Sequence, residues 1–521
     1  MCDTKYLYGA SVQGIQDFIF KTSKLREIIG ASELVEKICT SLFMKIAAIQ
    51  ENDKKNIILN AAGNIKYIFE KESACQAFVK EFPKEVMTMA PGITISQAVV
   101  RFPDNSLIPP ILNLPDAINA LEKKIKTQRN KPSMPHETGF MGLERSRRTG
   151  GVAIEDRKNH GVICEASKLK IDSFGHDKEE VNILFEKVAG KKITNELLAA
   201  DINEITESGN NAWLAVIHAD GNAVGKLVQS LAESLKLLSS DKQKSAFSDF
   251  SKALDQSTKE ASKAAFKAIM VSFDKLVREK GDKRALKYPL RPILLGGDDI
   301  TLIIRADLAL EFTKVFLAEF EKQTEKNFSF LKTDFNIPGF EKGITASAGI
   351  AYFKKAYPLH YALHLADLLC ADAKQTAKKN MDGIIPKSTL AFYKVQESFI
   401  EDLETLKNKT LKAVLSDVDF AYGPYLLHKI DSTSANLTDL EAKLQILANH
   451  ATDKSKSVSK LRKWISELYN DSNTADLMMK RFIQIAENKG DSLYKDLNIA
   501  NWKENKKTII YDLVQLHSLK Y

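Results

Sequence analysis

The strongest constraint on the fold of this chain is an internal repeat. The run GITISQAVVRF, beginning at Gly92, aligns with GITASAGIAYF, beginning at Gly343, and the two share Gly, Ile, Thr, Ser and Phe at equal spacing. Their offset is 343 minus 92, or 251 residues. A second pair of segments, NAAGNIKYIF at 60–69 and LGGDDITLII at 295–304, aligns with an offset of 235. Self-similarity of this kind predicts two copies of one structural unit.

Each copy has the pattern strand, helix, strand, strand, helix, strand. Helices are indicated by apolar residues three and four positions apart, and strands by short β-rich runs between turn residues. The first copy predicts strands at 5–12, 56–60, 65–70 and 92–102, with helical segments at about 14–50 and 72–88. The second predicts strands at 211–219 and 343–353, a hairpin around GGDD, and helices before it and at 307–325. This order predicts an α+β fold.

The copies divide the chain into four expected domains. We predict a first α+β domain at 1–105, an insertion at 106–205, a second α+β domain at 206–395 and a helical domain at 396–521. The insertion contains KPSMPHETGFMGLERSRRTGG, whose Gly and Pro content indicates a loop or linker. After about residue 396 the pattern is helical to the end, without strand-like runs.

Composition excludes several classes. The 521 residues carry 75 Lys and Arg against 67 Asp and Glu, a net charge of +8, which permits nucleotide or nucleic-acid partners without demonstrating them. No two cysteines form a C-x-x-C pair, so a zinc ribbon or disulfide framework is not expected. The start of the chain has no signal-peptide pattern, and no run reaches the ~18 apolar residues of a membrane span. We therefore expect a cytoplasmic protein without a membrane partner. The five cysteines are Cys2, Cys39, Cys75, Cys164 and Cys370.

The GGDD hairpin places two adjacent carboxylates, Asp298 and Asp299, at a turn between buried strands. Two such charges are costly unless they are paired or bound to metal. Asp220 directly follows the strand at 211–219, which should neighbour the hairpin. Three carboxylates on adjacent strands could hold two Mg²⁺ or Mn²⁺ ions about 3.5–4 Å apart, as in-line phosphoryl transfer requires.

Glycines around these carboxylates suit a nucleotide. Gly296 and Gly297 let the backbone approach a base, sugar or phosphate closely. Gly221 and Gly225 lie where a strand passes into a helix, so the amides there could cradle a triphosphate, and Lys226 could add positive charge.

Each of these motifs can also be interpreted without a role in catalysis or binding. GGDD alone could be a surface hairpin, and DGNAVG a turn before a helix. Lys374 and Lys378 share one helix face, which is either solvated or a grip on phosphate. His176-Asp177 is read as a solvated loop, because a metal-dependent HD site needs further ligands that are not well placed. His218 alternates with apolar residues and is read as a core histidine.

Taken together, LLGGDDITLII, IHADGNAVG, ITASAGIAYF and PLHYALHLADLLCADAKQTAKK resemble the second palm domain of the large subunit of type III CRISPR effector complexes, the Cmr/Csm polymerase. GGDEF diguanylate cyclases are more distant kin. The N-terminal YGASVQGIQDFIF resembles that family's first palm, and SVSKLRKW at 457–464 resembles a motif of its helical domain. The resemblance covers most of the chain and implies two ferredoxin-like palms.

The resemblance implies that Mg²⁺ or Mn²⁺ and ATP bind the second palm, and that ATP is joined 3′–5′ into cyclic oligoadenylates. The first palm, where Gly63 and Asn64 replace the two aspartates, would help to hold the acceptor nucleotide. The implied partners are the other subunits, guide RNA and target RNA. The implied metal ligands are Asp220, Asp298 and Asp299, and the expected nucleotide contacts are Gly221, Asn222, Gly225, Lys226, Gly296, Gly297, Lys374 and Lys378.

Two departures from the family pattern matter. The chain opens directly into the first palm, so we expect no HD nuclease domain, and the insertion keeps only Cys164 of a four-cysteine zinc site, so we expect no zinc. Three alternatives stay open: transfer of AMP to S-adenosylmethionine by the same site, a non-catalytic scaffold subunit, and a stand-alone cyclase without RNA.

Overall fold

The structure is a computed structural model with two compact units. One consists of Met1–Ile205, Ala223–Leu302 and Glu319–Ile344, and the other of Thr206–Asn222, Ile303–Ala318 and Thr345–Tyr521. The described residues are 4–520 except 62, 104–112, 132–141, 159, 175–180, 207–211, 237, 281–286, 336, 338–341, 398–399, 401, 432–433, 452–455 and 500–501.

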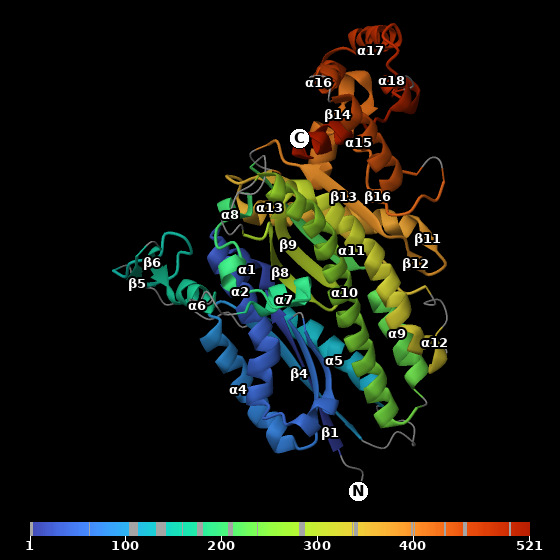
Figure 1. Ribbon diagram of the computed structural model, residues 1–521. Coiled ribbons are helices and arrows are strands. Elements are labelled where there is room, and N and C mark those ends of the chain that lie inside the picture. The colour runs from blue at the N-terminus through green and yellow to red at the C-terminus, as the bar shows by residue number, and fades with distance from the viewer. Residues whose placement is uncertain are drawn as a thin grey trace. The chain divides into compact units, whose positions relative to one another are not determined.

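A four-stranded antiparallel sheet forms the first palm (Figure 1). Its strand order is β2-β3-β1-β4. The core beside β1 is aromatic, because Tyr8 packs edge-on against Phe78, which in turn stacks on Phe82. The strands are β1 (Thr4–Gln13), β2 (Ile57–Ala61), β3 (Asn64–Phe69) and β4 (Thr94–Pro103), and the first helices are α1 (Ile15–Phe20), α2 (Leu25–Lys37), α3 (Phe43–Ile46) and α4 (Glu72–Met89).

A second, six-stranded sheet has the order β16-β13-β10-β7-β9-β8. Its four strands β8-β9-β7-β10 repeat the order β2-β3-β1-β4 of the first sheet, with the same chain sequence of elements. The internal repeat inferred from the alignment is therefore confirmed. The strands are β7 (Trp213–Gly221), β8 (Leu290–Gly296), β9 (Asp299–Arg305), β10 (Ala346–Lys354), β13 (Thr389–Lys394) and β16 (Tyr425–Leu426).

Helix α13 (Leu359–Lys379) packs directly on β10. The two can approach closely because Gly349 lacks a side chain. A Cβ at this position would lie 2.1 Å from the carbonyl oxygen of Ala366 and 2.5 Å from the amide of Cys370. Small residues of α13, such as Ala366 and Ala373, are fully buried. This contact fixes the height of α13 above the sheet.

Helix α10 (Ser240–Lys280) separates β7 from β8 in the chain and belongs to the first compact unit with β8. It carries a buried polar stripe, in which Ser257, Thr258 and Ser262 have no exposed surface. Helix α9 (Val224–Leu235) precedes it, and α11 (Ala306–Asn327) and α12 (Ser329–Thr333) follow β9.

Part of the segment expected to be an insertion completes the first palm. Helix α5 (Leu114–Arg129) packs on β1 and β4, and a Cβ on Gly9 would lie 2.5 Å from Leu121 Cδ2. The remainder forms the hairpin β5 (Ala153–Arg157) and β6 (Gly161–Cys164) with the helices α6 (Glu165–Ser173), α7 (Ile183–Ala189) and α8 (Ile202–Thr206). Residues 132–141 of the expected loop at 131–151 lie outside the described residues.

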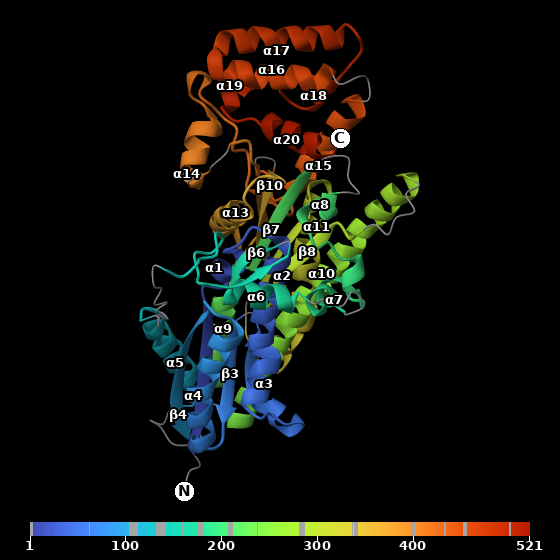
Figure 2. The same cartoon turned by 90° about the vertical axis from the view of Figure 1, so that its left-hand side faces the viewer.

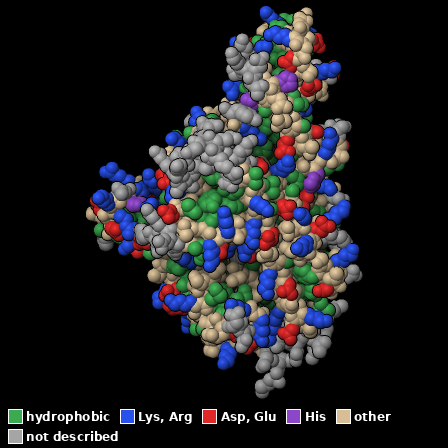
Figure 3. All heavy atoms as spheres, in the orientation of Figure 1, with side chains coloured by type: hydrophobic (Ala, Val, Ile, Leu, Met, Phe, Trp, Pro, Cys, Tyr) green, Lys and Arg blue, Asp and Glu red, His purple; other side chains and the backbone are tan. Residues whose placement is uncertain are grey.

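Charged side chains surround the β5–β6 hairpin (Figure 3). Several of them pair with one another: Arg157 lies 3.2 Å from Glu155 and 2.7 Å from Asp172. Below the hairpin the buried Glu27 of α2 contacts Arg148 at 2.5 Å and Ser167 at 3.2 Å. Arg148 precedes the hairpin and Ser167 follows it in α6, so the segments on both sides of the hairpin are joined to α2.

The chain beyond residue 396 is mainly helical, with α16 and α17 side by side (Figure 2). Trp464 is completely buried there. The expectation of no strands in this region is wrong: β14 (Lys412–Ala413), β15 (Val418–Asp419) and β16 are too short to produce an alternating pattern. The helices are α14 (Leu403–Thr405), α15 (Leu437–Ala451), α16 (Lys456–Asn470), α17 (Ser472–Glu487), α18 (Leu493–Asp496), α19 (Trp502–Asn505) and α20 (Ile510–Lys520).

Among the described residues, no helix combines the length and the apolar character needed to cross a membrane.

Candidate active site

Asp220, Asp298 and Asp299 come together at one end of the second sheet. Asp220 lies near the end of β7, and Asp299 is the first residue of β9. Strands β7 and β9 are hydrogen-bonded neighbours in that sheet. Each residue offers one carboxylate oxygen, and these oxygens all lie within 4.8 Å of one another. Among the described residues, this is the group of acidic, histidine or cysteine side chains that could hold a metal ion.

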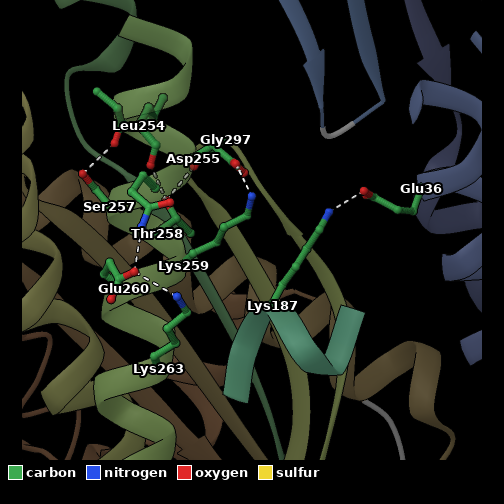
Figure 4. A network of polar contacts seen from close by, with 12 residues as sticks. Glu36, Lys187, Leu254, Asp255, Ser257, Thr258, Lys259, Glu260, Lys263 and Gly297 are labelled. Carbon is green, nitrogen blue, oxygen red and sulfur yellow. Dashed lines mark hydrogen bonds and ion pairs between the residues drawn. The ribbon is translucent and has the colours of Figure 1, made fainter. Parts of the chain in front are cut away.

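The turn that carries two of these carboxylates is held by helix α10 (Figure 4). Gly297 has φ of 62°, a left-handed conformation that side chains with a Cβ rarely adopt. The hydroxyl of Thr258 donates a 2.6 Å hydrogen bond to the carbonyl oxygen of Gly297. Gly296 ends β8 and is buried, so the predicted glycines form the turn itself.

The electrostatics of the turn suit a cation. Burial, followed by the neighbouring charge of Asp299, raises the pKa of Asp298 from 3.8 to about 7. A divalent cation would offset both effects. The donors are all carboxylate oxygens, the ligands that Mg²⁺ prefers, so the residues present fit such an ion.

Lys374 on α13 reaches the same end of β7. Its ammonium group pairs with Asp220 Oδ2 and lies 3.3 Å from the carbonyl oxygen of Gly221. Burial, followed by the charge of Lys378, lowers the pKa of Lys374 from 10.5 to about 8. Lys378 itself is exposed one turn further along α13. The structure therefore brings Lys374, rather than Lys378, to Asp220.

Asn222 has a structural contact that the sequence did not indicate. It is 4% exposed, and its amide donates to Thr345 Oγ1 and accepts from Ser347 Oγ, each at 3.0 Å. These bonds join the end of β7 to the start of β10, which places Asp220. The side chain is engaged within the sheet, whereas the prediction assigned it to a nucleotide.

The remaining residues of the DGNAVGK segment form the entry to α9. Ala223 caps the helix with φ of 62°, and Gly225 and Lys226 are exposed on the first turn. The structure places them at a helix N-terminus, as the sequence predicts. Their role in holding a phosphate stays a prediction.

The sequence predicts a core position for His218 and a solvated loop for His176 and Asp177. His218 lies within β7 with its Nε2 atom 3.7 Å from Asp367 Oδ1, and it is not part of the carboxylate group. His176 and Asp177 lie outside the described residues. Cys164 contacts Thr149 Oγ1 at 3.1 Å.

Thr258 is the functional candidate that sequence reasoning missed. It is a single threonine in a helix rich in Ala, Lys and Ser, 39 residues before the glycine that it contacts. A threonine bonded to a distant turn has no spacing signature, so only the folded chain identifies it.

This fold and this cluster define a protein with two palm domains, of which the second carries the acidic residues. Residues 213–382 match the family model of Cas10/Cmr2, second palm domain. The resemblance to the large subunit of type III CRISPR complexes, inferred from the sequence motifs, is therefore confirmed. A search of curated proteins gives no significant match.

Solved structures support the same fold. A Csm1-Csm4 cassette in complex with cA4 is 14% identical, with a TM-score of 0.54. Csm1 from T. onnurineus is 15% identical, with a TM-score of 0.53, and a Csm1-Csm4 cassette with pppApA is 14% identical, with a TM-score of 0.52. Each comparison covers 100% of this chain and 70% of the other. At these identities the likeness concerns the fold alone.

Proposed function

We propose that the chain is the nucleotidyltransferase subunit of a type III CRISPR complex, which uses ATP and Mg²⁺ or Mn²⁺ to make a cyclic oligoadenylate when target RNA is bound. The observation that carries the proposal is the convergence of Asp220, Asp298 and Asp299 within 4.8 Å on adjacent strands of the second palm. Solved Csm1-Csm4 cassettes in complex with cA4 and with pppApA support oligoadenylates as the class of product to test for.

The proposed reaction is in-line attack of an acceptor 3′-hydroxyl on the α-phosphate of a donor ATP. A new bond forms between the 3′-oxygen and the α-phosphorus, and the bond from the α-phosphorus to the oxygen that bridges to the β-phosphate breaks. Pyrophosphate leaves with that electron pair, and the hydroxyl proton is released to solvent. The protein contributes positioning and charge stabilisation rather than a covalent intermediate.

The three aspartates would hold the divalent cations. A bound divalent cation supplies charge neutralisation at the phosphates and makes the attacking hydroxyl more acidic. Lys374 contacts Asp220 in this structure and would bind a phosphate oxygen there. Thr258 keeps the GGDD turn in place, and Gly297 leaves open space where a nucleotide approaches, because a Cβ there would meet no atom within 4 Å.

The test uses the purified protein or complex with α-labelled ATP, Mg²⁺ and target RNA, with and without S-adenosylmethionine, and identifies products by mass spectrometry. The double variant D298N/D299N should lose product by at least about 10²-fold, since charge-stabilising groups of this kind contribute that much. A matched control is D241N, which alters a carboxylate with 95% of its side chain exposed. Unchanged product in D298N/D299N would refute the proposed site.

Manganese binding gives a readout that does not depend on turnover. Titration followed by electron paramagnetic resonance should show Mn²⁺ bound by the wild type and by D241N, and weakened at least about tenfold in D298N/D299N. Product that appears only with S-adenosylmethionine would favour AMP transfer to that acceptor. Product without RNA would favour a stand-alone cyclase, and RNA-dependent assembly without any product would favour a scaffold subunit.

A further inference from the structure

A cavity lies within the compact unit that carries Asp220, at the end of β7 opposite to that residue. It has a volume of about 910 Å³, within the range typical of ligand sites. Trp213, the first residue of β7, lines it, together with Lys354 at the end of β10 and Lys394 at the end of β13. Trp213 and Asp220 are seven residues apart on one strand, or roughly 23 Å. The cavity is therefore separate from the candidate active site.

Three cationic side chains gather around this cavity. The ammonium nitrogen of Lys394 lies 4.4 Å from the centroid of the Trp213 ring, and that of Lys354 lies 5.5 Å from it. The pKa of Lys394 is lowered from 10.5 to about 8. Burial is the largest cause, and the positive charges of Arg462 and Lys354 also contribute. Lysines and arginines that repel one another in a cavity wall are stabilised when an anion binds among them.

Acidic partners for these cations are scarce. None of the three forms an ion pair with another residue that the structure describes, and Lys394 instead donates to the Ser518 hydroxyl on α20. Glu397 lines the cavity, but both of its carboxylate oxygens accept from the hydroxyl of Tyr393 at 3.0 Å. The cavity therefore has an excess of positive charge.

Aromatic and apolar side chains form a further part of the wall. Tyr357, Tyr469 and Tyr511 line it with Ile465 and Val514.

We propose that this cavity binds a nucleoside phosphate, with the phosphate held by Lys354, Lys394 and Arg462 and the base packed on the aromatic wall. Charge-assisted hydrogen bonds to phosphate and stacking of a base on aromatic rings are the two interactions that such a wall supplies. The volume exceeds what a free phosphate ion needs. A free nucleotide and the terminal nucleotide of an RNA strand carry this same chemistry.

The test is isothermal titration calorimetry on the full chain in EDTA, which removes the cations on which the candidate active site depends. ATP should bind the wild type and D298N/D299N with equal affinity. Binding should weaken at least tenfold in K354A, whose side chain is exposed at a strand end, and in K394M, which keeps most of the buried stem. The matched control is K463A, because Lys463 follows Arg462 on α16 but does not line the cavity.

A 5′-phosphorylated hexamer of adenosine, titrated in the same way, distinguishes the two sources: tighter binding than ATP assigns the cavity to an RNA end, and weaker binding assigns it to a free nucleotide. The proposal is overturned if ATP and the hexamer both fail to bind in EDTA, if K354A and K394M bind both as the wild type does, or if tripolyphosphate binds as tightly as ATP. Because no turnover is measured, these results are independent of whether the proposed function holds.

Discussion

Replacing Thr258 with Val removes the hydrogen bond that helix α10 makes to the GGDD turn, together with a longer, 3.1 Å bond from the same hydroxyl to the carbonyl oxygen of Leu254 within the helix. Valine keeps the shape of threonine but removes the hydroxyl that donates to the Gly297 carbonyl oxygen at 2.6 Å. Thr258 has no exposed surface, so no water replaces the lost donor directly. The carbonyl is left with an unmet hydrogen bond on the buried side of the turn.

The size of the effect follows from this burial. A buried polar group without a partner costs about 1–3 kcal/mol. Since about 1.4 kcal/mol corresponds to a factor of ten, the equilibrium between the held and the released turn should shift toward release by roughly 5- to 150-fold. T258S, which keeps the hydroxyl, should shift it little.

Amide hydrogen exchange measures this opening directly. Peptides covering 290–305 should exchange faster in T258V by the same factor, because local opening exposes their amides. The control is S262A, which removes another fully buried hydroxyl of α10, one that bonds to the Thr258 carbonyl oxygen rather than to the turn. If T258V and S262A exchange alike in this region, the hydroxyl does not hold the turn.

Three further variants test other parts of the structure. K374M should lower kcat/KM for ATP at least about tenfold, because it removes the cation beside Asp220. K378M changes an exposed neighbour on the same helix and should leave kcat/KM unchanged. Equal effects of the two variants would contradict the assignment of Lys374 to a phosphate. G349A should lower the thermal midpoint by the equivalent of about 1–3 kcal/mol, because its Cβ would lie 2.1 Å from a backbone oxygen of α13; an unchanged midpoint would show that the helix yields freely. D512N tests pH dependence. Burial raises the pKa of Asp512 to about 7, so between its ordinary 3.8 and 7 the folded chain holds the proton more tightly, and stability falls as pH rises through this window. The thermal midpoint of D512N should therefore lose less between pH 5 and pH 8 than that of the wild type, and parallel curves would argue against the shift.

Most of the palm architecture could be predicted from the sequence, because the internal repeat shows the same pattern of strands and helices twice. The hairpin, the flanking strands and the position of Asp220 all follow from apolar runs and turn residues that are visible locally. The three carboxylates could be predicted to meet because β7 and β9 were expected to be adjacent, and the structure makes them adjacent.

What the sequence could not supply depends on contacts between distant segments. The amide of Asn222 bonds to Thr345 and Ser347, which are more than a hundred residues away, so its role in joining strands leaves no local pattern. Residues 106–205 were predicted to be an insertion, because the packing of α5 on the first sheet depends on a contact between distant residues, in which Leu121 fits against the bare backbone of Gly9.

The two-residue strand β16 has a mechanical consequence. Leu390 of β13 pairs with Tyr425, and Thr389 pairs with Leu426, which extends the second sheet into the C-terminal region. Tyr425 also donates a 2.5 Å hydrogen bond to Asp512 of α20. Helix α20 is therefore joined through β16, β13 and β10 to β7, the strand that carries Asp220, so a displacement of α20 would be transmitted along this series of paired strands.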